Sequence, residues 1–239
     1  MSAGNILLTS APASSLTLVL KRALDVVGSA FGLVVLLPLF PVTALAIKLD
    51  SPGPVFFRQE RVGRHGRPFR IYKFRSMTVA ASGSALTVRA DKRVTRIGAI
   101  LRKTKLDELP QLINVLSGDM SLVGPRPEVP EFMRHYSPEQ RAVILSMRPG
   151  MTDYAAILFR DESALLDGND DPVSFYRHRI MPIKFAHYER YSRDVGVMND
   201  LRIILATVSL LAIGHVPKRL GIESKVTLVP CATGGEGQR

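Results

Sequence analysis

Two adjacent acids, Asp107 and Glu108, are the first candidates for chemistry in this sequence of 239 residues. Neighbouring side chains on a helix point about 100° apart, so these carboxylates are not expected to share one proton as a facing pair would. They can instead play separate roles at one site. The alternative is structural, because Thr104-Lys105-Leu106-Asp107 has the pattern of a capping box and acids are favoured at a helix N-terminus. Pro110 suits a first turn and predicts a helix that begins nearby, so spacing alone favours the structural interpretation.

A second candidate is the arginine between two prolines in Ser121-Leu122-Val123-Gly124-Pro125-Arg126-Pro127. The prolines restrict the backbone on both sides of Arg126, which reduces the entropy lost when its guanidinium binds an anion. The segment is predicted to be an irregular, stiff loop. A rigid connector with an incidental arginine is an equally good interpretation of the pattern.

Two basic runs contribute to a formal net charge of +11, which comes from 32 Lys and Arg against 21 Asp and Glu. The first run contains Arg58, Arg61, Arg64, Arg67, Arg70, Lys73 and Arg75, and the second contains Arg89, Lys92, Arg93, Arg96, Arg102, Lys103 and Lys105. Beside a membrane segment, such residues bind anionic headgroups at about 1 kcal/mol per charge. Some of them can instead clamp a diphosphate, for which arginine offers a planar fork. A solvated basic face is the structural alternative.

The most distinctive element that must position these residues is an uncharged stretch at residues 26–47. A straight helix of about 22 residues would be about 33 Å long, enough to cross the hydrocarbon core of a bilayer. Pro38 and Pro41 lie inside this stretch and predict a sharp kink near residues 37–41.

Basic residues flank the apolar stretch on both sides, with Lys21 and Arg22 before it and Lys48 and the first basic run after it. A single crossing should have one basic side and one less basic side. Two half-length limbs with both ends in the cytoplasm fit this pattern better. We therefore expect a re-entrant membrane helix broken at Pro38, with a kinked spanning helix as the alternative.

The rest of the chain is predicted to be a compact α/β catalytic domain, mainly α with a small β-hairpin and interfacial amphipathic helices. Short strands are expected at residues 55–57 and 69–74, and helices at residues 94–101, 106–116, 138–147, 182–193 and 200–213. The last helix is too short to span a membrane, so it belongs to the core or lies on the membrane surface. The predicted organisation is a flexible leader (1–20), the re-entrant helix (21–50), the catalytic domain (51–215) and a flexible tail (216–239).

Several other classes of site and protein are disfavoured. The one cysteine, Cys231, permits neither an intrachain disulfide nor a cysteine-based zinc site, and the five histidines lack metal-binding spacing. The net charge raises the hypothesis of a membrane-tethered nucleic-acid-binding protein. No helix-turn-helix or RNA-recognition signature accompanies it, so no nucleic-acid partner is expected.

Several motifs occur in one order along the chain. Lys21-Arg22 and Asp25 precede the broken apolar helix, and Ser51-Pro52-Gly53-Pro54, Tyr72-Lys73-Phe74-Arg75-Ser76-Met77 and the stretch from Leu101 to Pro127 follow it. This arrangement resembles the bacterial sugar transferase family, the monotopic phosphoglycosyl transferases. The resemblance covers about residues 21–213, and the stretch 101–127 is its most specific part. A catalytically silent scaffold of the same fold is a further hypothesis, which the intact Asp107, Glu108 and Arg126 disfavour.

The resemblance implies an activity. Members of the family move a sugar 1-phosphate from a UDP-sugar to a polyprenol phosphate, usually undecaprenyl phosphate, at the cytoplasmic face of the bacterial inner membrane. UMP is released, and the polyprenyl diphosphate sugar enters glycan assembly. The reaction passes through a covalent phosphosugar–enzyme intermediate and needs Mg²⁺. Anionic lipids are expected partners as well, and a homodimer is left open.

The resemblance also implies roles for individual residues. Asp107 would be the nucleophile and a contact of the metal, and Glu108 would assist the lipid phosphate or the metal. The predicted phosphate or substrate contacts are Lys73, Arg75, Arg102 and Arg126. One departure from the family pattern is Asp153, near which many relatives have a second glycine, so the donor sugar stays undetermined.

Overall fold

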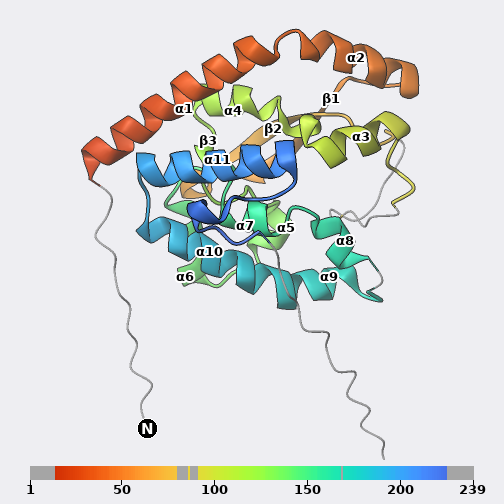
Figure 1. Cartoon of the computed structure of the whole chain (residues 1–239). Coiled ribbons are helices and arrows are strands. Elements are labelled where there is room, and N and C mark those ends of the chain that lie inside the picture. Colours follow the sequence, from red (N-terminus) through yellow and green to blue (C-terminus); the bar gives the residue numbers. More distant parts are fainter. Residues whose placement is uncertain (1–13, 80–85, 87–90, 168, 225–239) are drawn as a thin grey trace, which may run out of the picture.

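The structure, a computed structural model, describes residues 14–79, 86, 91–167 and 169–224 (Figure 1). The chain begins with two helices, α1 (Ser15–Leu36) and α2 (Leu39–Asp50), which meet at an angle of 61°. Pro38 lies between them and has no backbone N–H with which to continue the hydrogen-bond ladder of α1. The break is therefore present where the sequence predicts it. Pro41 lies in the first turn of α2, where proline is tolerated.

The start of α1 differs from the sequence-based expectation. The Ser14 hydroxyl accepts a hydrogen bond from the N–H of Thr17 at 3.1 Å and caps the helix. Residues 15–20 thus form the first turns of α1, although they were predicted to belong to a loose leader. The remainder of that leader, residues 1–13, lies outside the described residues.

The bent pair lies along the top of the molecule, with α4 and α11 beneath α1 and α3 beneath α2 (Figure 1). Its outer surface is apolar. The large exposed side chains include Val27, Phe31, Val34, Val35, Leu37, Val42, Leu45 and Leu49. Within the described residues, no single helix is long and apolar enough to cross a bilayer, but α1 and α2 together reach that length and composition as a bent pair.

The predicted hairpin is present and is longer than expected. Strands β1 (Phe56–Val62) and β2 (Pro68–Phe74) pair in antiparallel register, with Phe56 opposite Phe74. The phenylalanine rings of this pair stack with their centroids 5.4 Å apart, and Phe74 also meets Phe40 of α2 edge to face. These contacts hold the hairpin against the bent pair.

The middle of the chain winds through short elements that carry the candidate site. They are α3 (Arg96–Thr104), a 3₁₀ turn (Leu106–Glu108), α4 (Gln111–Ser117) and β3 (Ser121–Val123). Strand β4 (Gly150–Thr152) pairs with β3 in parallel. The single helix predicted over residues 106–116 is therefore interrupted, because the 3₁₀ turn ends at Glu108 and α4 starts only after Pro110, which has no backbone N–H to donate.

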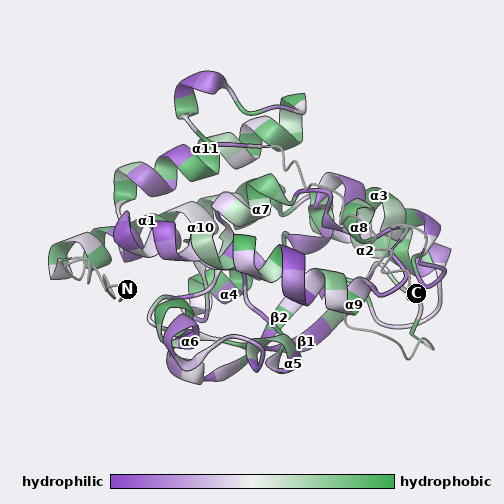
Figure 2. Ribbon diagram, turned by 90° about the horizontal axis from the view of Figure 1, so that it is seen from below, coloured by the Kyte–Doolittle hydropathy of each residue, from purple (hydrophilic) through white to green (hydrophobic). Residues whose placement is uncertain are grey.

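The remaining helices form the lower layer. They are α5 (Pro130–Met133), α6 (Pro138–Leu145), α7 (Tyr154–Leu158), α8 (Glu162–Leu166), α9 (Pro172–Phe175), a π-helical turn (Tyr176–Ile180), α10 (Met181–Arg193) and α11 (Val197–Ile213). Their buried side chains make the largest apolar cluster, which includes Phe132, Ile144, Leu158, Tyr176 and Tyr188. Seen from the side opposite α1 and α2, hydrophobic and hydrophilic segments alternate along α10 and α11 (Figure 2). Such alternation is expected of helices with one buried face.

The C-terminal helix belongs to the core on one face only. Ile203, Ala206 and Leu210 of α11 are buried against α7 and α10, while its opposite face is exposed. The chain after α11 is held as well, since the guanidinium of Arg202 donates to the carbonyl of Leu220 at 2.7 Å. Residues 216–222 thus pack against α11, although a flexible tail was predicted from residue 216; residues 225–239 lie outside the described part.

Candidate active site

The acid pair lies in the connection between α3 and α4, which we call the acid loop (residues 105–110). Lys105 ends α3 with φ of 59°, and Asp107 and Glu108 follow in the 3₁₀ turn. The Thr104 hydroxyl donates to the carbonyl of Ile100 at 2.8 Å and therefore does not cap a following helix. The capping-box interpretation is therefore wrong, whereas the helix predicted to begin near Pro110 is present, because α4 starts at Gln111.

Glu108 is clamped by two cations from distant parts of the chain. Lys73 Nζ of β2 lies 2.9 Å from Glu108 Oε1. Arg126 donates from Nη1 to Glu108 Oε2 at 3.0 Å and from Nη2 to Oε1, which makes a two-pronged ion pair. Burial alone would raise the pKa of Glu108, but the charges of Arg126 and Lys73 outweigh it and hold that pKa well below its usual range. Glu108 is therefore an ionised carboxylate held in one orientation.

Asp107 is held in the opposite way. It is 7 % exposed, and its Oδ1 atom is buried without a hydrogen-bond partner among the described residues. Burial and the neighbouring charge of Glu108 raise the pKa of Asp107, while the nearby cations Lys73, Lys105 and Arg102 oppose the shift. A buried carboxylate oxygen of raised basicity is a competent nucleophile or a ligand for a hard cation.

The predicted phosphate contacts divide into two groups. Lys73 and Arg126 meet at Glu108, and the charge of Arg102, in the last turn of α3, acts on Asp107. Arg75 lies elsewhere. Its buried guanidinium donates to the carbonyls of Pro52 at 2.8 Å and Ser51 at 2.6 Å, where α2 ends. These contacts fasten α2 to β2, so Arg75 is better described as a support of the site than as a substrate contact.

An asparagine that sequence reasoning missed aligns Lys73 with the acid loop. The side chain of Asn114 in α4 accepts from the N–H of Tyr72 at 2.9 Å and donates to the carbonyl of Arg70 at 2.9 Å. It thus binds the backbone of β2 on both sides of Ile71. Because α4 follows the acid loop directly, this pair of hydrogen bonds sets the distance between Lys73 and Glu108.

The segment Gly124-Pro125-Arg126-Pro127, which we call the Arg126 loop, follows β3 and is positioned by the parallel pairing of β3 with β4. Gly124 and Gly150 cross so closely that a Cβ on Gly150 would lie 2.1 Å from the backbone nitrogen of Gly124. Both positions therefore require glycine. Behind the loop, Arg61 Nη1 donates to the carbonyl of Pro127 at 3.0 Å. The backbone of the loop is thus held on both sides of Arg126.

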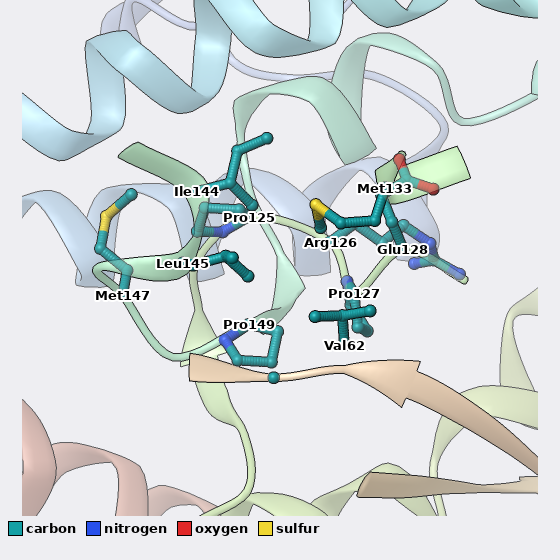
Figure 3. Close-up of a pocket in the computed structure, with 11 residues that line it drawn as sticks. Val62, Pro125, Arg126, Pro127, Glu128, Met133, Ile144, Leu145, Met147 and Pro149 are labelled. Carbon is teal, nitrogen blue, oxygen red and sulfur yellow. The ribbon is translucent and has the colours of Figure 1, made fainter. Parts of the chain in front are cut away.

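A buried polar relay supports the residue after this loop. Glu128 accepts a hydrogen bond from the hydroxyl of Tyr176 at 3.1 Å, which in turn accepts one from Lys184 at 3.1 Å. Lys184 also pairs with Glu162 at 2.5 Å. The sequence carried no local signal for this relay, whose members come from four separate elements. A small pocket adjoins it, lined by residues of the loop and of α5 and α6 that include Pro125, Arg126, Met133 and Leu145 (Figure 3).

Comparison with known proteins decides the family. The model of the bacterial sugar transferase family matches residues 16–214. The chain belongs to the bacterial sugar transferase family. It is 42 % identical over 208 residues to an exopolysaccharide production protein of Rhizobium leguminosarum bv. phaseoli, covering 80 % of this chain and 94 % of that protein.

Two further relatives carry names that state a reaction. A UDP-glucose:undecaprenyl-phosphate glucose-1-phosphate transferase of Caulobacter vibrioides is 44 % identical over 195 residues, covering 80 % of this chain and 69 % of the relative. The Escherichia coli protein of the same name is 39 % identical over 202 residues, covering 82 % of this chain and 41 % of the relative. The chain is therefore a transferase.

The donor set of this transferase is suited to a magnesium ion that is shared with substrate. The described residues contain no group of three or more His, Cys, Asp or Glu side chains arranged to hold a metal. Mg²⁺ commonly binds through one or two carboxylates and completes its coordination with water and substrate phosphates. The free Oδ1 of Asp107 fits such a ligand.

Asp153 is a further buried acid near the Arg126 loop. It caps α7 through Oδ1, which accepts from the N–H of Ala156 at 2.5 Å, and its Oδ2 has no hydrogen-bond partner among the described residues. Burial raises the pKa of Asp153 to about 6, opposed by its hydrogen bond to Ala156 and by the charges of Lys184 and Arg126. The sequence marked this position only as a departure from the family pattern.

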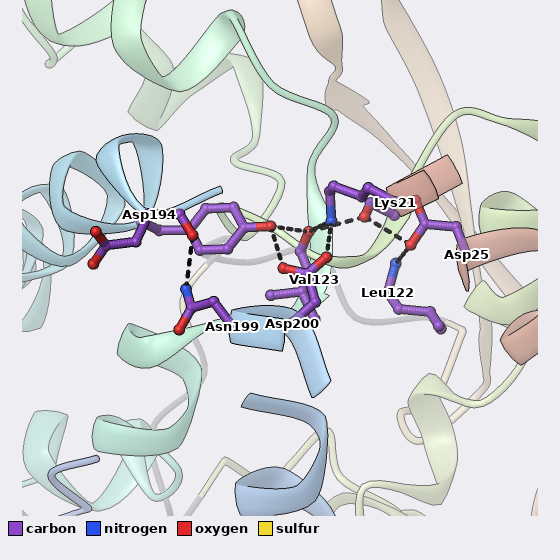
Figure 4. Close-up of polar contacts among 9 residues, drawn as sticks. Lys21, Asp25, Leu122, Val123, Asp194, Asn199 and Asp200 are labelled. Carbon is purple, nitrogen blue, oxygen red and sulfur yellow. Dashed lines mark hydrogen bonds and ion pairs between the residues drawn. The ribbon is translucent and has the colours of Figure 1, made fainter. Parts of the chain in front are cut away.

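The motif Lys21-Arg22 and Asp25 joins the bent pair to the rest of the transferase. Lys21 Nζ donates to the carbonyl of Val123 at 2.9 Å and pairs with Asp200 at 2.5 Å (Figure 4). The carboxylate of Asp25 accepts from Ser121 Oγ and from the N–H of Leu122, both at 2.9 Å. Strand β3, which leads into the Arg126 loop, is therefore bound directly to α1. We call this group the junction cluster; it comprises Lys21, Asp25, Ser121, Tyr191 and Asp200.

Proposed function

We propose that this transferase moves a sugar 1-phosphate from a UDP-sugar to undecaprenyl phosphate, releasing UMP and giving an undecaprenyl diphosphate sugar. The relatives named for glucose-1-phosphate transfer to undecaprenyl phosphate support the reaction class. The mechanism rests on a contrast between two adjacent acids. Asp107 has a buried oxygen without a hydrogen-bond partner among the described residues, whereas Glu108 is bound by both Lys73 and Arg126.

In the first half-reaction, an oxygen of Asp107 attacks the sugar-bearing phosphorus of the donor. A bond forms between that oxygen and phosphorus, and the bond from phosphorus to the bridging oxygen of the diphosphate breaks. UMP leaves with the electron pair of that bond. In the second half-reaction, an oxygen of the lipid phosphate attacks the same phosphorus and the bond to Asp107 breaks, which restores the carboxylate.

The cations of the site reduce the repulsion between an anionic nucleophile and an anionic diphosphate. Lys73 and Arg126 lie one residue away from Asp107, on Glu108, and Arg102 lies on the preceding turn. A bound Mg²⁺ held by Asp107 and the donor phosphates would supply further charge neutralisation and polarise the phosphoryl group. Glu108 keeps both cations ordered beside the nucleophile, and in this proposal it also assists the lipid phosphate in the second half-reaction.

The bent pair would bring this chemistry to the membrane surface. Its apolar outer side chains suit burial in lipid, and basic residues flank its uncharged stretch, with Lys21 and Arg22 within α1 before it and Lys48 within α2 after it. A re-entrant segment with both ends in the cytoplasm would place the acid loop at the cytoplasmic face of the inner membrane. A soluble sugar nucleotide and a membrane-embedded lipid phosphate can meet only at such an interface.

The test is a panel of UDP-sugars incubated with the full-length protein in membranes that contain undecaprenyl phosphate. At least one sugar is expected to release UMP and to label the lipid. Asp107→Asn should lower turnover by at least about 10³-fold, as removal of a nucleophile does. Asp119→Asn is the matched control, because Asp119 is an exposed acid just beyond α4. No UMP release with any sugar, or normal turnover by Asp107→Asn, would contradict the proposal.

A further inference from the structure

Gln111, the first residue of α4, has a buried side-chain amide whose nitrogen makes no hydrogen bond within the described part of the fold. Its side chain is 2 % exposed, and Nε2 has no hydrogen-bond partner among the described residues. Buried donors are almost always paired in native proteins, so an unpaired one calls for an explanation. A position that a ligand oxygen occupies during the reaction is one such explanation.

The backbone places this amide in line with Glu108, the acid that directly follows Asp107. Residues 106–113 wind in a right-handed helical path, since Leu109 donates to Leu106 at 3.3 Å and Leu112 donates to Leu109 at 3.0 Å. These are i→i+3 hydrogen bonds, and side chains three residues apart on such a path lie one above the other. Gln111 is three residues from Glu108 and so lies beside that side chain, one residue from Asp107, whose buried Oδ1 has no hydrogen-bond partner among the described residues.

A second buried amide on α4, that of Asn114, makes hydrogen bonds through both its oxygen and its nitrogen. Asn114 is 1 % exposed, and the partners of its amide are backbone groups of β2. Asn114 is therefore an ordinary structural amide. The contrast between the two residues indicates that the unpaired state of Gln111 is specific to the end of α4 that meets the acid loop.

None of the ion pairs described above provides a hydrogen-bond donor for the phosphoryl group that Asp107 attacks. Lys73 and the fork of Arg126 are engaged with Glu108, which is the neighbour of the nucleophile and not the nucleophile itself. Attack on phosphorus shifts negative charge among the phosphoryl oxygens, and a preorganised neutral donor stabilises such charge without forming a permanent pair with Asp107.

We infer that Gln111 is a further catalytic residue, whose Nε2 donates a hydrogen bond to a non-bridging oxygen of the sugar-bearing phosphoryl group while Asp107 attacks it. This assignment rests on the phosphoglycosyl transfer proposed above. The amide forms and breaks no covalent bond; it holds the phosphoryl group in line with Asp107 and returns to its unpaired state when the product leaves.

The experiment compares Gln111→Met, which keeps the length of the side chain and removes the donor, with Asn114→Leu as the structural control. The rate of phosphosugar adduct formation is measured with UDP-sugar and Mg²⁺ in the absence of lipid acceptor, together with the KM for the donor and the thermal unfolding midpoint. We expect Gln111→Met to slow adduct formation by about 10²-fold with a donor KM within about threefold of wild type. Its unfolding midpoint should equal or exceed that of wild type, because no hydrogen bond of the resting enzyme is lost. Asn114→Leu should lower the midpoint.

Two results would overturn the assignment. One is a wild-type rate of adduct formation in Gln111→Met. The other is an unfolding midpoint that falls as in Asn114→Leu, because it would show that the Gln111 amide is paired in the resting fold. A wild-type enzyme that forms no adduct with any donor would instead refute the proposed function, so the two failures are distinguishable.

Discussion

Two buried polar groups, the junction cluster and the acid loop, lie at opposite ends of the segment that runs from β3 to Arg126. In the junction cluster, Lys21 and Tyr191 both bind Asp200, and two donors meet Asp25. In the acid loop and its continuation, Asp107 Oδ1 and Gln111 Nε2 have no partner within the described residues. Both groups are buried, but only in the junction cluster does every named carboxylate have hydrogen-bond partners.

The difference separates two uses of buried polarity. A buried charge whose hydrogen bonds are all made holds elements together, and here it fixes the bent pair to the domain. A buried polar atom without a partner weakens the fold, and a ligand that pairs with it during the reaction is one reason for its presence. Removal of a charge should therefore destabilise the junction cluster, but should slow the reaction or even stabilise the protein near the acid loop.

The largest expected effect on rate outside Asp107 comes from Arg126. Arg126→Gln removes the fork that neutralises Glu108 and lies beside the nucleophile, so turnover should fall by about 10²–10³-fold. The control is Arg67→Gln, which changes an exposed arginine of the first basic run. Turnover by Arg126→Gln within about threefold of the control would remove Arg126 from the site.

The largest expected loss of stability comes from Lys21. Lys21→Met leaves the carboxylate of Asp200, 1 % exposed, without its cation and should lower the free energy of unfolding by about 3–5 kcal/mol. The measurement is denaturant unfolding of the purified protein in lipid nanodiscs. Adding Asp200→Asn should recover part of the loss, and Lys48→Met, at an exposed lysine of α2, should change little. Equal stability of Lys21→Met and wild type would refute the structural role of the junction cluster.

Asp153→Asn should raise the free energy of unfolding, whereas Lys21→Met should lower it. The folded-state pKa of Asp153, about 6, lies above the unfolded value, so its ionisation costs stability as pH rises through this range. Asparagine also caps helices and keeps the bond to Ala156. The variant should therefore be more stable than wild type by about 3 kcal/mol at pH 7.5 and by about half of that at pH 5. A stability gap that is constant or reversed over this pH range would contradict the burial of a charged Asp153.

The smallest effect is expected at Arg75. Arg75→Lys keeps the charge but loses the fork on the carbonyls at the end of α2, which should lower the free energy of unfolding by about 1–2 kcal/mol. The KM for the donor should stay within about twofold of wild type. A tenfold rise in that KM without loss of stability would instead support the phosphate contact that the family resemblance implies.

Local patterns predicted the parts of the molecule that short-range physics decides. Proline chemistry located the break at Pro38, and the short strands expected at residues 55–57 and 69–74 located the hairpin. The short helices α7 and α8 were missed because they have too few turns for a periodic pattern. The pairing of β3 with β4 joins Ser121 to Gly150, and no local signal reports such a distant contact.

For the candidate site too, the sequence predicted which residues belong to it but not every contact they make. The family motif named Asp107, Glu108, Lys73 and Arg126, of which the last three meet in space. It could not separate Arg75, which lies just after β2 and binds backbone carbonyls, from Lys73, two residues earlier on that strand. Nor could it single out Gln111, since an unpaired amide and a paired one look alike in a sequence.

The most direct test of the account is the intact mass of the full-length protein after brief exposure to its UDP-sugar donor, Mg²⁺ and no lipid acceptor. The account predicts an added mass equal to one sugar phosphate, located on Asp107 by peptide mapping, absent from Asp107→Asn and lost when undecaprenyl phosphate is added. Lipid-dependent turnover by a wild-type enzyme that never carries this adduct, even after rapid quenching, would contradict the central claim that Asp107 attacks the donor.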